Sequence, residues 1–166
     1  MEFCKYHSLG NDYLVYDSKK NQKELEQEEI VRICSRNFGI GSDGIVAGPY
    51  MEGENMHVRV YNPDGTEAEQ GGNALRIFSH YLKAAGYIRS ESFTLYTKSG
   101  SCEMRYLNRQ GNRIQMTMGQ LSFDSETLQL SGPKREAVHE YFNCGGEEYD
   151  CPCVSIGNPH CVFLRE

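Results

Sequence analysis

The segment that decides the fold runs from Tyr61 to Gly86 and reads YNPDGTEAEQGGNALRIFSHYLKAAG. Its opening Asn62-Pro63-Asp64-Gly65 is typical of a tight turn, because proline presets φ and glycine accepts a positive φ. Apolar residues then recur at helical spacing, at Leu75, Phe78, Leu82 and Ala85. The segment therefore predicts the end of a strand, a turn, and a helix that stops at Gly86.

Gly71, Gly72 and Asn73 fall where this helix begins. Backbone N–H groups without intrahelical partners converge at a helix N-terminus, and the helix dipole favours negative charge there. Two glycines allow a ligand to approach the backbone closely, so a small carboxylate would fit this place. The alternative is an ordinary loop in which Asn73 only caps the helix.

Four motifs carry a resemblance to a known family. The string Asn62-x-Asp64-Gly65-Thr66, followed by Gly72-Asn73 and Arg76, resembles the active-site signature of diaminopimelate epimerases. Three further stretches resemble other motifs of that family in the same order: His7 to Tyr13, Arg36 to Gly44, and Gly157 to His160. The chain is identified as a member of that family.

The resemblance implies an α+β fold in which mixed and antiparallel strands wrap around a central helix, in two similar lobes that close on a substrate. Residues 1–118 would form the first lobe, and residues 119–166 the beginning of a second, incomplete lobe. The resemblance also implies an isomerase that inverts the α-carbon of an amino acid, LL- to meso-diaminopimelate, in lysine and cell-wall precursor synthesis. It implies no pyridoxal phosphate, no metal and no other cofactor, and a homodimer stays open.

Two positions depart from the family pattern. The family places a catalytic cysteine immediately before the Gly-Asn pair, where this chain has Gly71, and Ala74 replaces a glycine that the family usually carries. The second catalytic cysteine would lie beyond Glu166. Glycine cannot transfer a proton, so a symmetric mechanism with two thiols is excluded on this side.

The resemblance assigns substrate-binding roles to five residues, through amide side chains or backbone N–H groups: Asn11, Asn62, Gly72, Asn73 and Asn158. The alternative for the asparagines is turn or cap chemistry, which asparagine favours. His160 matches a histidine near the catalytic centre, and its alternative is a structural, hydrogen-bonded histidine.

Glu69 is a candidate replacement for the missing thiol, because a carboxylate in a dry pocket can have a raised pKa and act as a base. Its alternative is a solvated surface charge beside a turn. Asp43, Asp64 and Arg76 are expected to fix loop geometry rather than to perform chemistry.

The composition is that of an ordinary globular protein, with 39% hydrophobic and 24% charged residues. A formal net charge of −6 argues against nucleic-acid binding, since no basic stripe is present to meet phosphates. No apolar run is long enough to span a membrane, and the N-terminus lacks the apolar core of a signal peptide. The sequence thus predicts a cytoplasmic protein whose partner is a small amino acid.

Seven cysteines suit reduced thiols better than a disulfide framework. Cys4 and Cys34 lie in apolar contexts and are expected in the core. A zinc site is the minor alternative for the later group, which consists of Cys144, Cys151, Cys153 and Cys161.

Alternating patterns predict strands, and a helical pattern predicts a first helix from about Glu24 to Asn37. The expected strands are 3–7, 13–17, 44–47, 56–61, 92–97, 101–106, 113–118, 138–142, 153–156 and 160–164.

Three hypotheses for function stay open. The first is an amino-acid epimerase or racemase of the diaminopimelate epimerase type. The second is an inactive amino-acid-binding protein that keeps the carboxylate pocket. The third is an isomerase on the same fold that uses a carboxylate base, Glu69.

Overall fold

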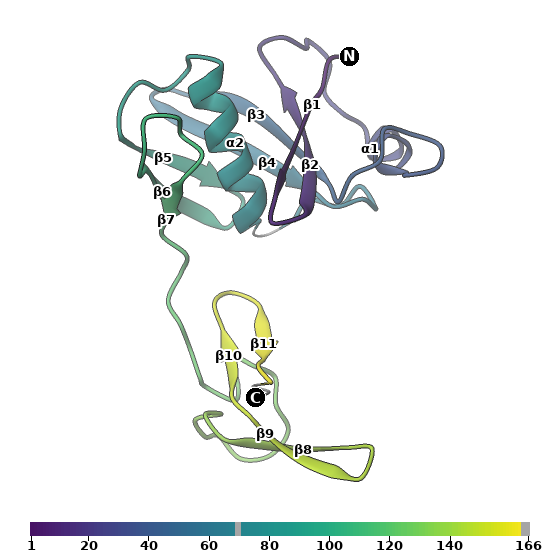
Figure 1. The fold of residues 1–166 in the computed structure, drawn as a ribbon, viewed down its shortest axis with the longest axis vertical. Coiled ribbons are helices and arrows are strands. Elements are labelled where there is room, and N and C mark those ends of the chain that lie inside the picture. The colour runs from purple at the N-terminus through teal and green to yellow at the C-terminus, as the bar shows by residue number, and fades with distance from the viewer. Residues whose placement is uncertain (69–70, 164–166) are drawn as a thin grey trace. The chain divides into compact units, whose positions relative to one another are not determined.

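The computed structural model describes residues 1–68 and 71–163 and divides into two compact units, Met1–Thr117 and Met118–Glu166 (Figure 1). Each unit has its own sheets and its own buried cluster. That the first unit is an epimerase lobe and the second the beginning of another stays a prediction.

The described part of the first unit contains a seven-stranded sheet whose strands follow one another in chain order. The pairs β2–β3 and β4–β5 are parallel and the others antiparallel. The strands are β1 (Cys4–Ser8), β2 (Asn11–Asp17), β3 (Ile45–Glu52), β4 (Asn55–Tyr61), β5 (Ser92–Thr97), β6 (Gly100–Tyr106) and β7 (Ile114–Met116).

Helix α2 (Gly72–Ala84) lies against this sheet and contacts both its first strand, β1, and its last, β7 (Figure 1). A helix that touches both edges of a seven-stranded sheet requires the sheet to curl around it. The predicted α+β class, with mixed strands wrapped around a central helix, is confirmed.

The apolar residues of α2 explain its position. Leu75, Phe78 and Leu82 are buried against Val60 of β4, Met104 of β6 and other side chains of the main core. Burial of each large apolar side chain stabilises the fold by about 1.5–3 kcal/mol. The core therefore fixes α2 along its length and places its N-terminus firmly.

A buried carboxylate ties β2 to α2. Asp17 is 3% exposed and accepts hydrogen bonds from the hydroxyls of Tyr81 at 2.5 Å and Tyr87 at 2.9 Å. The backbone N–H of Lys19 donates to its other oxygen at 2.9 Å. Burial opposes ionisation, but these hydrogen bonds outweigh it and lower the pKa of Asp17 below its ordinary value.

A second cluster covers the opposite face of the sheet, where helix α1 (Gln27–Cys34) packs Ile30 and Cys34 against Leu14, Tyr16 and Ile45. The prediction of a helix from Glu24 to Asn37 was too long at both ends. The carboxylate of Glu29 accepts the N–H of Glu26 at 3.2 Å, which caps the helix start. At the other end Ser35 has ψ 122°, which stops the helical path.

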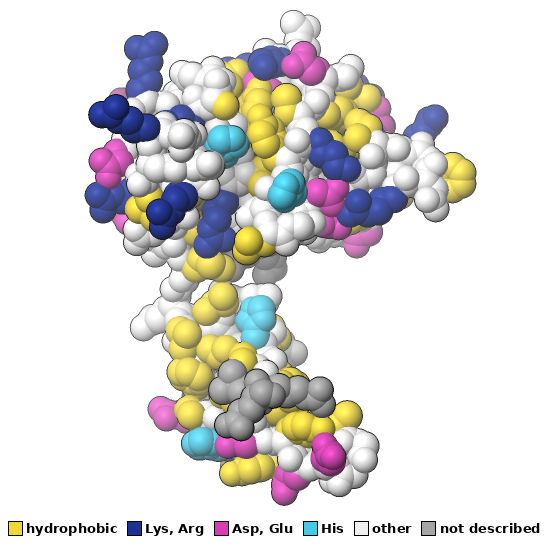
Figure 2. Space-filling view, in the orientation of Figure 1, with side chains coloured by type: hydrophobic (Ala, Val, Ile, Leu, Met, Phe, Trp, Pro, Cys, Tyr) yellow, Lys and Arg dark blue, Asp and Glu magenta, His cyan; other side chains and the backbone are white. Residues whose placement is uncertain are grey.

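The described part of the second unit contains two hairpins and a small core of Leu128, Ala137 and Cys153. Strand β8 (Glu140–Cys144) pairs with β9 (Glu147–Cys151), and β10 (Cys153–Ser155) pairs with β11 (Pro159–Cys161). Apolar side chains are spread over the face of this unit that Figure 2 shows. Tyr141 and Phe163 are among the exposed large apolar side chains of the unit.

Several predicted strand bounds needed correction. Strand β3 is longer than 44–47, β7 is shorter than 113–118, and β8 begins two residues later than the predicted 138. Strand β9 was not predicted, because Glu147, Glu148 and Asp150 are poor strand formers. The predicted strand 160–164 runs beyond the described residues. No helix in the described ranges is long and apolar enough to cross a membrane.

Candidate functional site

Three of the four sequence motifs meet at the N-terminus of α2. The side-chain amide of Asn11 donates to Oδ2 of Asp43 at 2.8 Å. The amide of Asn73 donates in turn to Oδ1 of Asn11 at 3.2 Å. Residues from β2, from the loop before β3 and from the first turn of α2 are thus held in one hydrogen-bonded chain.

Asp43 is also held by backbone hydrogen bonds to Asp12 and by an ion pair with Arg36. Its Oδ2 accepts the backbone N–H of Asp12 at 3.0 Å, and its own N–H donates to the carbonyl of Asp12 at 2.8 Å. The Arg36 guanidinium bridges the carboxylates of Asp12 at 2.6 Å and Asp43 at 2.7 Å, and Lys5 lies 2.9 Å from Asp12. Hydrogen bonds from Arg36 hold the pKa of Asp12 well below its usual range. This network fixes the loop, as expected of Asp43.

Asn73 does not cap the helix. The cap is Gly71, whose carbonyl accepts the N–H of Leu75 at 2.8 Å, and Asn73 lies inside the first turn with its amide directed to Asn11. The capping alternative for Asn73 was therefore wrong. The first turn carries no acidic side chain, so its positive dipole end is not neutralised by an acidic residue of that turn.

Asn62 lies in the predicted turn, and its backbone N–H and side-chain amide form hydrogen bonds within that turn. Its N–H donates to the carbonyl of Thr66 at 2.8 Å and its amide to the hydroxyl of Thr66 at 3.0 Å. Asp64 closes the turn by accepting the N–H and hydroxyl of Thr66. Gly65 is required, because its φ is +81° and a Cβ there would lie 2.4 Å from Gln27. The hydrogen bonds of Asn62 are those of the turn, and they do not join it to the Asn11 chain.

Gly71 has ordinary extended φ, −155°, so its backbone would accept a side chain. The space is the constraint: a Cβ at Gly71 would lie 3.1 Å from Cγ1 of Val60 and 3.2 Å from the methyl carbon of Ala74. Both departures from the family pattern thus lie against each other. Glu69, the candidate carboxylate base, lies outside the described residues.

The thiols of the first unit lie in other places. Cys34 is buried on α1 beside the hydroxyl of Ser42, and burial raises the pKa of its thiol. Cys4 is on β1 and Cys102 on β6, both half-buried. Within the described ranges, no group of three or more His, Cys, Asp or Glu side chains is arranged to hold a metal ion.

Asn158 and His160 belong to the second unit, in the hairpin between β10 and β11. Nε2 of His160 lies 3.1 Å from Oδ1 of Asn158, and both side chains are exposed. The turn that carries Asn158 is held by Ser155, whose hydroxyl accepts the N–H of Gly157 at 3.2 Å, and His160 follows on β11. The structure brings these two predicted residues together within their own unit.

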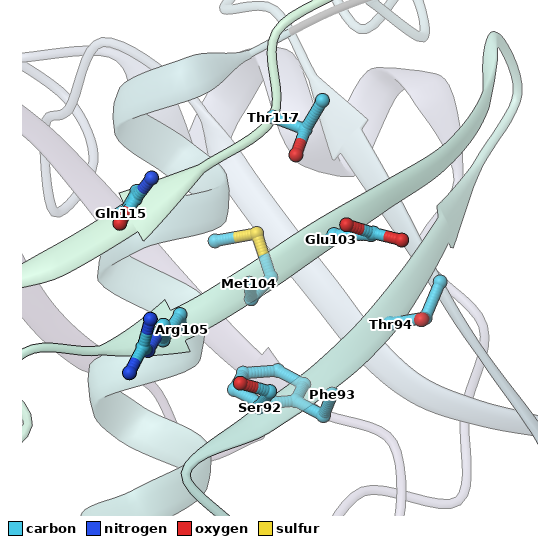
Figure 3. Close-up of a pocket in the computed structure, with 8 residues that line it drawn as sticks. All are labelled: Ser92, Phe93, Thr94, Glu103, Met104, Arg105, Gln115 and Thr117. Carbon is cyan, nitrogen blue, oxygen red and sulfur yellow. The ribbon is translucent and has the colours of Figure 1, made fainter.

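Two cavities of the first unit lie apart from the Asn11 chain. One of about 490 Å³ is formed by three neighbouring strands, β5, β6 and β7, with Thr94, Glu103 and Gln115 among its lining residues (Figure 3). Another of about 340 Å³ lies between β1 and α2, beside Lys5 and His80. The second cavity is also lined by His7, Ser8 and Arg76 of the family motifs, but neither cavity is lined by a residue to which the resemblance assigns substrate binding.

Sequence reasoning missed the closeness of Asp12, Arg36 and Asp43 around Asn11. The available signal was their charge pattern: an acidic residue directly after Asn11 and an arginine seven residues before Asp43. Side chains so far apart in sequence could not be joined without the parallel pairing of β2 and β3.

Comparison with known proteins identifies the family of the chain. The family model described as diaminopimelate epimerase matches residues 3–123. Diaminopimelate epimerase 2 of Nostoc sp. is 42% identical over all of this chain and 58% of its own length. Diaminopimelate epimerase of Moorella thermoacetica is 32% identical over all of this chain and 61% of its own length.

A solved structure of a hydroxyproline epimerase from Agrobacterium vitis, with bound trans-4-hydroxy-L-proline, has the same fold. It superposes with a TM-score of 0.65 at 12% identity, over 97% of this chain and 50% of that one. The chain spans about three fifths of the length of the two sequence relatives. By its motifs, its fold and these relatives, the chain belongs to the diaminopimelate epimerase family.

Proposed function

We propose that the natural protein is an amino-acid epimerase that converts LL- to meso-diaminopimelate without pyridoxal phosphate, in the synthesis of lysine and cell-wall precursors. The observation that carries the proposal is the chain Asp43–Asn11–Asn73 at the start of α2. The names of the relatives support the substrate.

The chemistry needs a site that stabilises charge. Removal of an α-proton leaves a carbanion whose charge moves onto the substrate carboxylate, and fixed N–H dipoles stabilise that charge without reorganising. The first turn of α2 supplies such dipoles at Gly72 and Asn73. Among the described residues, each of the Asn11 and Asn73 amides donates one hydrogen bond, and a side-chain amide carries two N–H groups.

The orientation of Asn11 is set before a substrate arrives. Its N–H side is fixed by the carboxylate of Asp43, and its oxygen is fixed by the amide of Asn73. Asp43 itself is held by Arg36 and by Asp12. A preorganised amide loses little entropy on binding, so it can discriminate an amino-acid head group from other anions.

Proton transfer on the Gly71 side needs a group other than a thiol. Glu69 is two residues away in sequence and is our candidate for a carboxylate base. Glu69→Gln removes the base while keeping the size of the side chain, and it should abolish turnover. A Glu69→Gln protein with full activity would end this assignment, and Glu67→Gln is the matched control.

The test of the proposed function is a stereochemical assay. The natural polypeptide, at whatever length its cell produces, is incubated with LL-diaminopimelate and the stereoisomers are separated on a chiral column. The meso isomer should accumulate with the wild type and much more slowly with Asn73→Ala. Absence of the meso isomer with a folded protein would contradict the proposal.

A second candidate function is favoured by Gly71. Without a thiol at that position, the same cluster could hold an amino acid without inverting it. Titration calorimetry would then show saturable binding of an amino acid, while the stereochemical assay would detect no meso isomer.

A further inference from the structure

The second unit places two cysteines directly opposite each other. In the antiparallel pair β10–β11, Cys153 is the partner of Cys161, and Ser155 is the partner of Pro159. The N–H of Cys153 donates to Ala137 at 2.9 Å and the N–H of Ser155 to Ser122 at 2.8 Å, so both point away from β11. Cys153 and Cys161 therefore form a non-hydrogen-bonded pair.

The neighbouring pair confirms this register, because Val162 donates its N–H to the carbonyl of Pro152 at 3.0 Å. Hydrogen-bonded and non-hydrogen-bonded pairs alternate along an antiparallel ladder. In the non-hydrogen-bonded kind the Cα atoms are about 4.5 Å apart, which lies within the range that a disulfide spans.

The two thiols differ in exposure but are in contact. Cys161 is exposed and Cys153 is 3% exposed, and the Cys161 thiol is close enough to help raise the pKa of Cys153. The Cys153 thiol itself donates to the carbonyl of Cys151 at 3.8 Å. Burial raises the pKa of Cys153 to about 11, and the contact with Cys161 adds to the rise. Cys151, at the end of β9, is fully buried, and burial together with the nearby Cys161 thiol raises its pKa as well.

We propose that Cys161 and Cys153 are a redox modification site that forms an intrachain disulfide in reaction with a small-molecule disulfide of the glutathione class. The exposed Cys161 thiolate attacks one sulfur of the small disulfide, forms a mixed disulfide and releases one small thiolate. The Cys153 thiol then loses its proton to solvent and attacks the Cys161 sulfur, which releases the second small thiolate. Two protein thiols are oxidised and one small disulfide is reduced to two thiols.

Cys153 is favoured over Cys151 as the second partner because of the ladder. Cys153 faces Cys161 across the strands, where a disulfide needs no movement of the backbone. Cys151 precedes Pro152 and belongs to the β8–β9 hairpin, so its backbone is not paired with β11.

The disulfide would close the hairpin that carries Asn158 in its turn and His160 on β11. Oxidation would thereby hold these two residues in one arrangement. This consequence for activity rests on the proposed function, whereas the modification itself does not.

The sequence gives a direct assay. No lysine or arginine lies between Arg135 and Arg165, so trypsin leaves Cys144, Cys151, Cys153 and Cys161 on one peptide. The natural polypeptide is treated with oxidised glutathione, its free thiols are blocked with iodoacetamide, and the disulfides are then reduced and labelled with N-ethylmaleimide. Tandem mass spectrometry should find the maleimide on Cys153 and Cys161, and the acetamide on Cys144 and Cys151.

Matched variants sharpen the test. Cys151→Ser should form the disulfide as the wild type does, and Cys161→Ser should form none. Cys153→Ser should stop at a stable glutathione adduct on Cys161. Maleimide on Cys151 with Cys161, or a wild type that carries only the glutathione adduct, would overturn the proposal, whether or not the protein proves to be an epimerase.

Discussion

The methyl carbon of Ala74 lies 3.2 Å from the position that a Cβ at Gly71 would occupy. The two residues are three positions apart at the start of α2, which makes them neighbours on the helix surface. The family resemblance places cysteine and glycine at these positions. The smaller and the larger residue are therefore exchanged between two positions in contact, and a cysteine at position 71 would be crowded by Ala74 as well as by Val60.

This contact predicts that the two positions are energetically coupled. Gly71→Cys alone should reduce the free energy of unfolding by about 1–3 kcal/mol through overpacking. Ala74→Gly alone should cost about 1 kcal/mol or more, because glycine is a poor helix former and a buried methyl is lost. The double variant should lose less free energy of unfolding than the two single variants lose together, by about 0.5 kcal/mol or more.

Denaturant titration of the four proteins measures this coupling. Ala84→Gly is the matched control, since Ala84 is exposed at the other end of α2 and should combine additively with Gly71→Cys. Strict additivity of Gly71→Cys with Ala74→Gly would show that the two residues do not constrain each other.

A second prediction concerns the acceptor of the Asn11 amide. Asp43→Ala leaves that amide and the N–H of Asp12 without their partner, so the amide is no longer oriented. Amino-acid binding should weaken by about tenfold, which corresponds to about 1.4 kcal/mol. Asp43→Asn keeps an oxygen acceptor and should lose less. Calorimetric titration of both variants checks the order, and equal affinities of wild type and Asp43→Ala would refute the positioning role.

A third prediction concerns the buried Asp17. Tyr81→Phe removes one of the two hydroxyls that stabilise its charge, and the free energy of unfolding should fall by about 1–3 kcal/mol. Tyr141→Phe, at a side chain that is 64% exposed, is the control and should have little effect. Thermal or denaturant unfolding measures the stability of both variants. Equal stabilities of Tyr81→Phe and Tyr141→Phe would contradict the prediction.

A fourth prediction concerns the loss of folding stability at acidic pH. The pKa values of Asp12 and Asp17 are lowered in the folded state from the ordinary 3.8, so below about pH 4 the unfolded chain binds more protons. Stability should therefore be fully present above that pH and fall as the pH drops. Arg36→Gln removes the main cause of the shift at Asp12, so this variant should be less stable at neutral pH and lose stability less steeply in acid. Unfolding curves at pH values from neutral to acid would give the free energy of unfolding against pH for the wild type and for Arg36→Gln. Equal slopes for the two proteins would contradict the prediction.

The sequence predicted the central helix and the turn at Asn62 to Gly65, because each depends on local spacing and on residues with strong preferences. The mixed sheet wrapped around that helix was implied by the family resemblance. It could not predict the Arg36–Asp12–Asp43 network, which depends on the parallel pairing of β2 with β3. It missed β9, where acidic residues form a strand through pairing with β8 rather than through propensity.

The candidate site was predicted unevenly for the same reason. Gly72 and Asn73 lie at the start of α2, as their spacing predicted, but the hydrogen bond that joins Asn73 to Asn11 was not predicted. Asn62 is engaged in its own turn, and Asn158 and His160 belong to the other unit. The substrate roles of all these residues stay predictions.

The most direct test of the central claim is hydrogen exchange at the α-carbon. The natural polypeptide is incubated with LL-diaminopimelate in deuterium oxide, and the α-proton signal is followed by NMR. An epimerase must replace that proton with deuterium as the meso isomer forms. Loss of the α-proton signal with the wild type, and much slower loss with Asn73→Ala, is the predicted result. Saturable binding of diaminopimelate with no deuterium at the α-carbon would contradict the claim and leave an amino-acid-binding protein in its place.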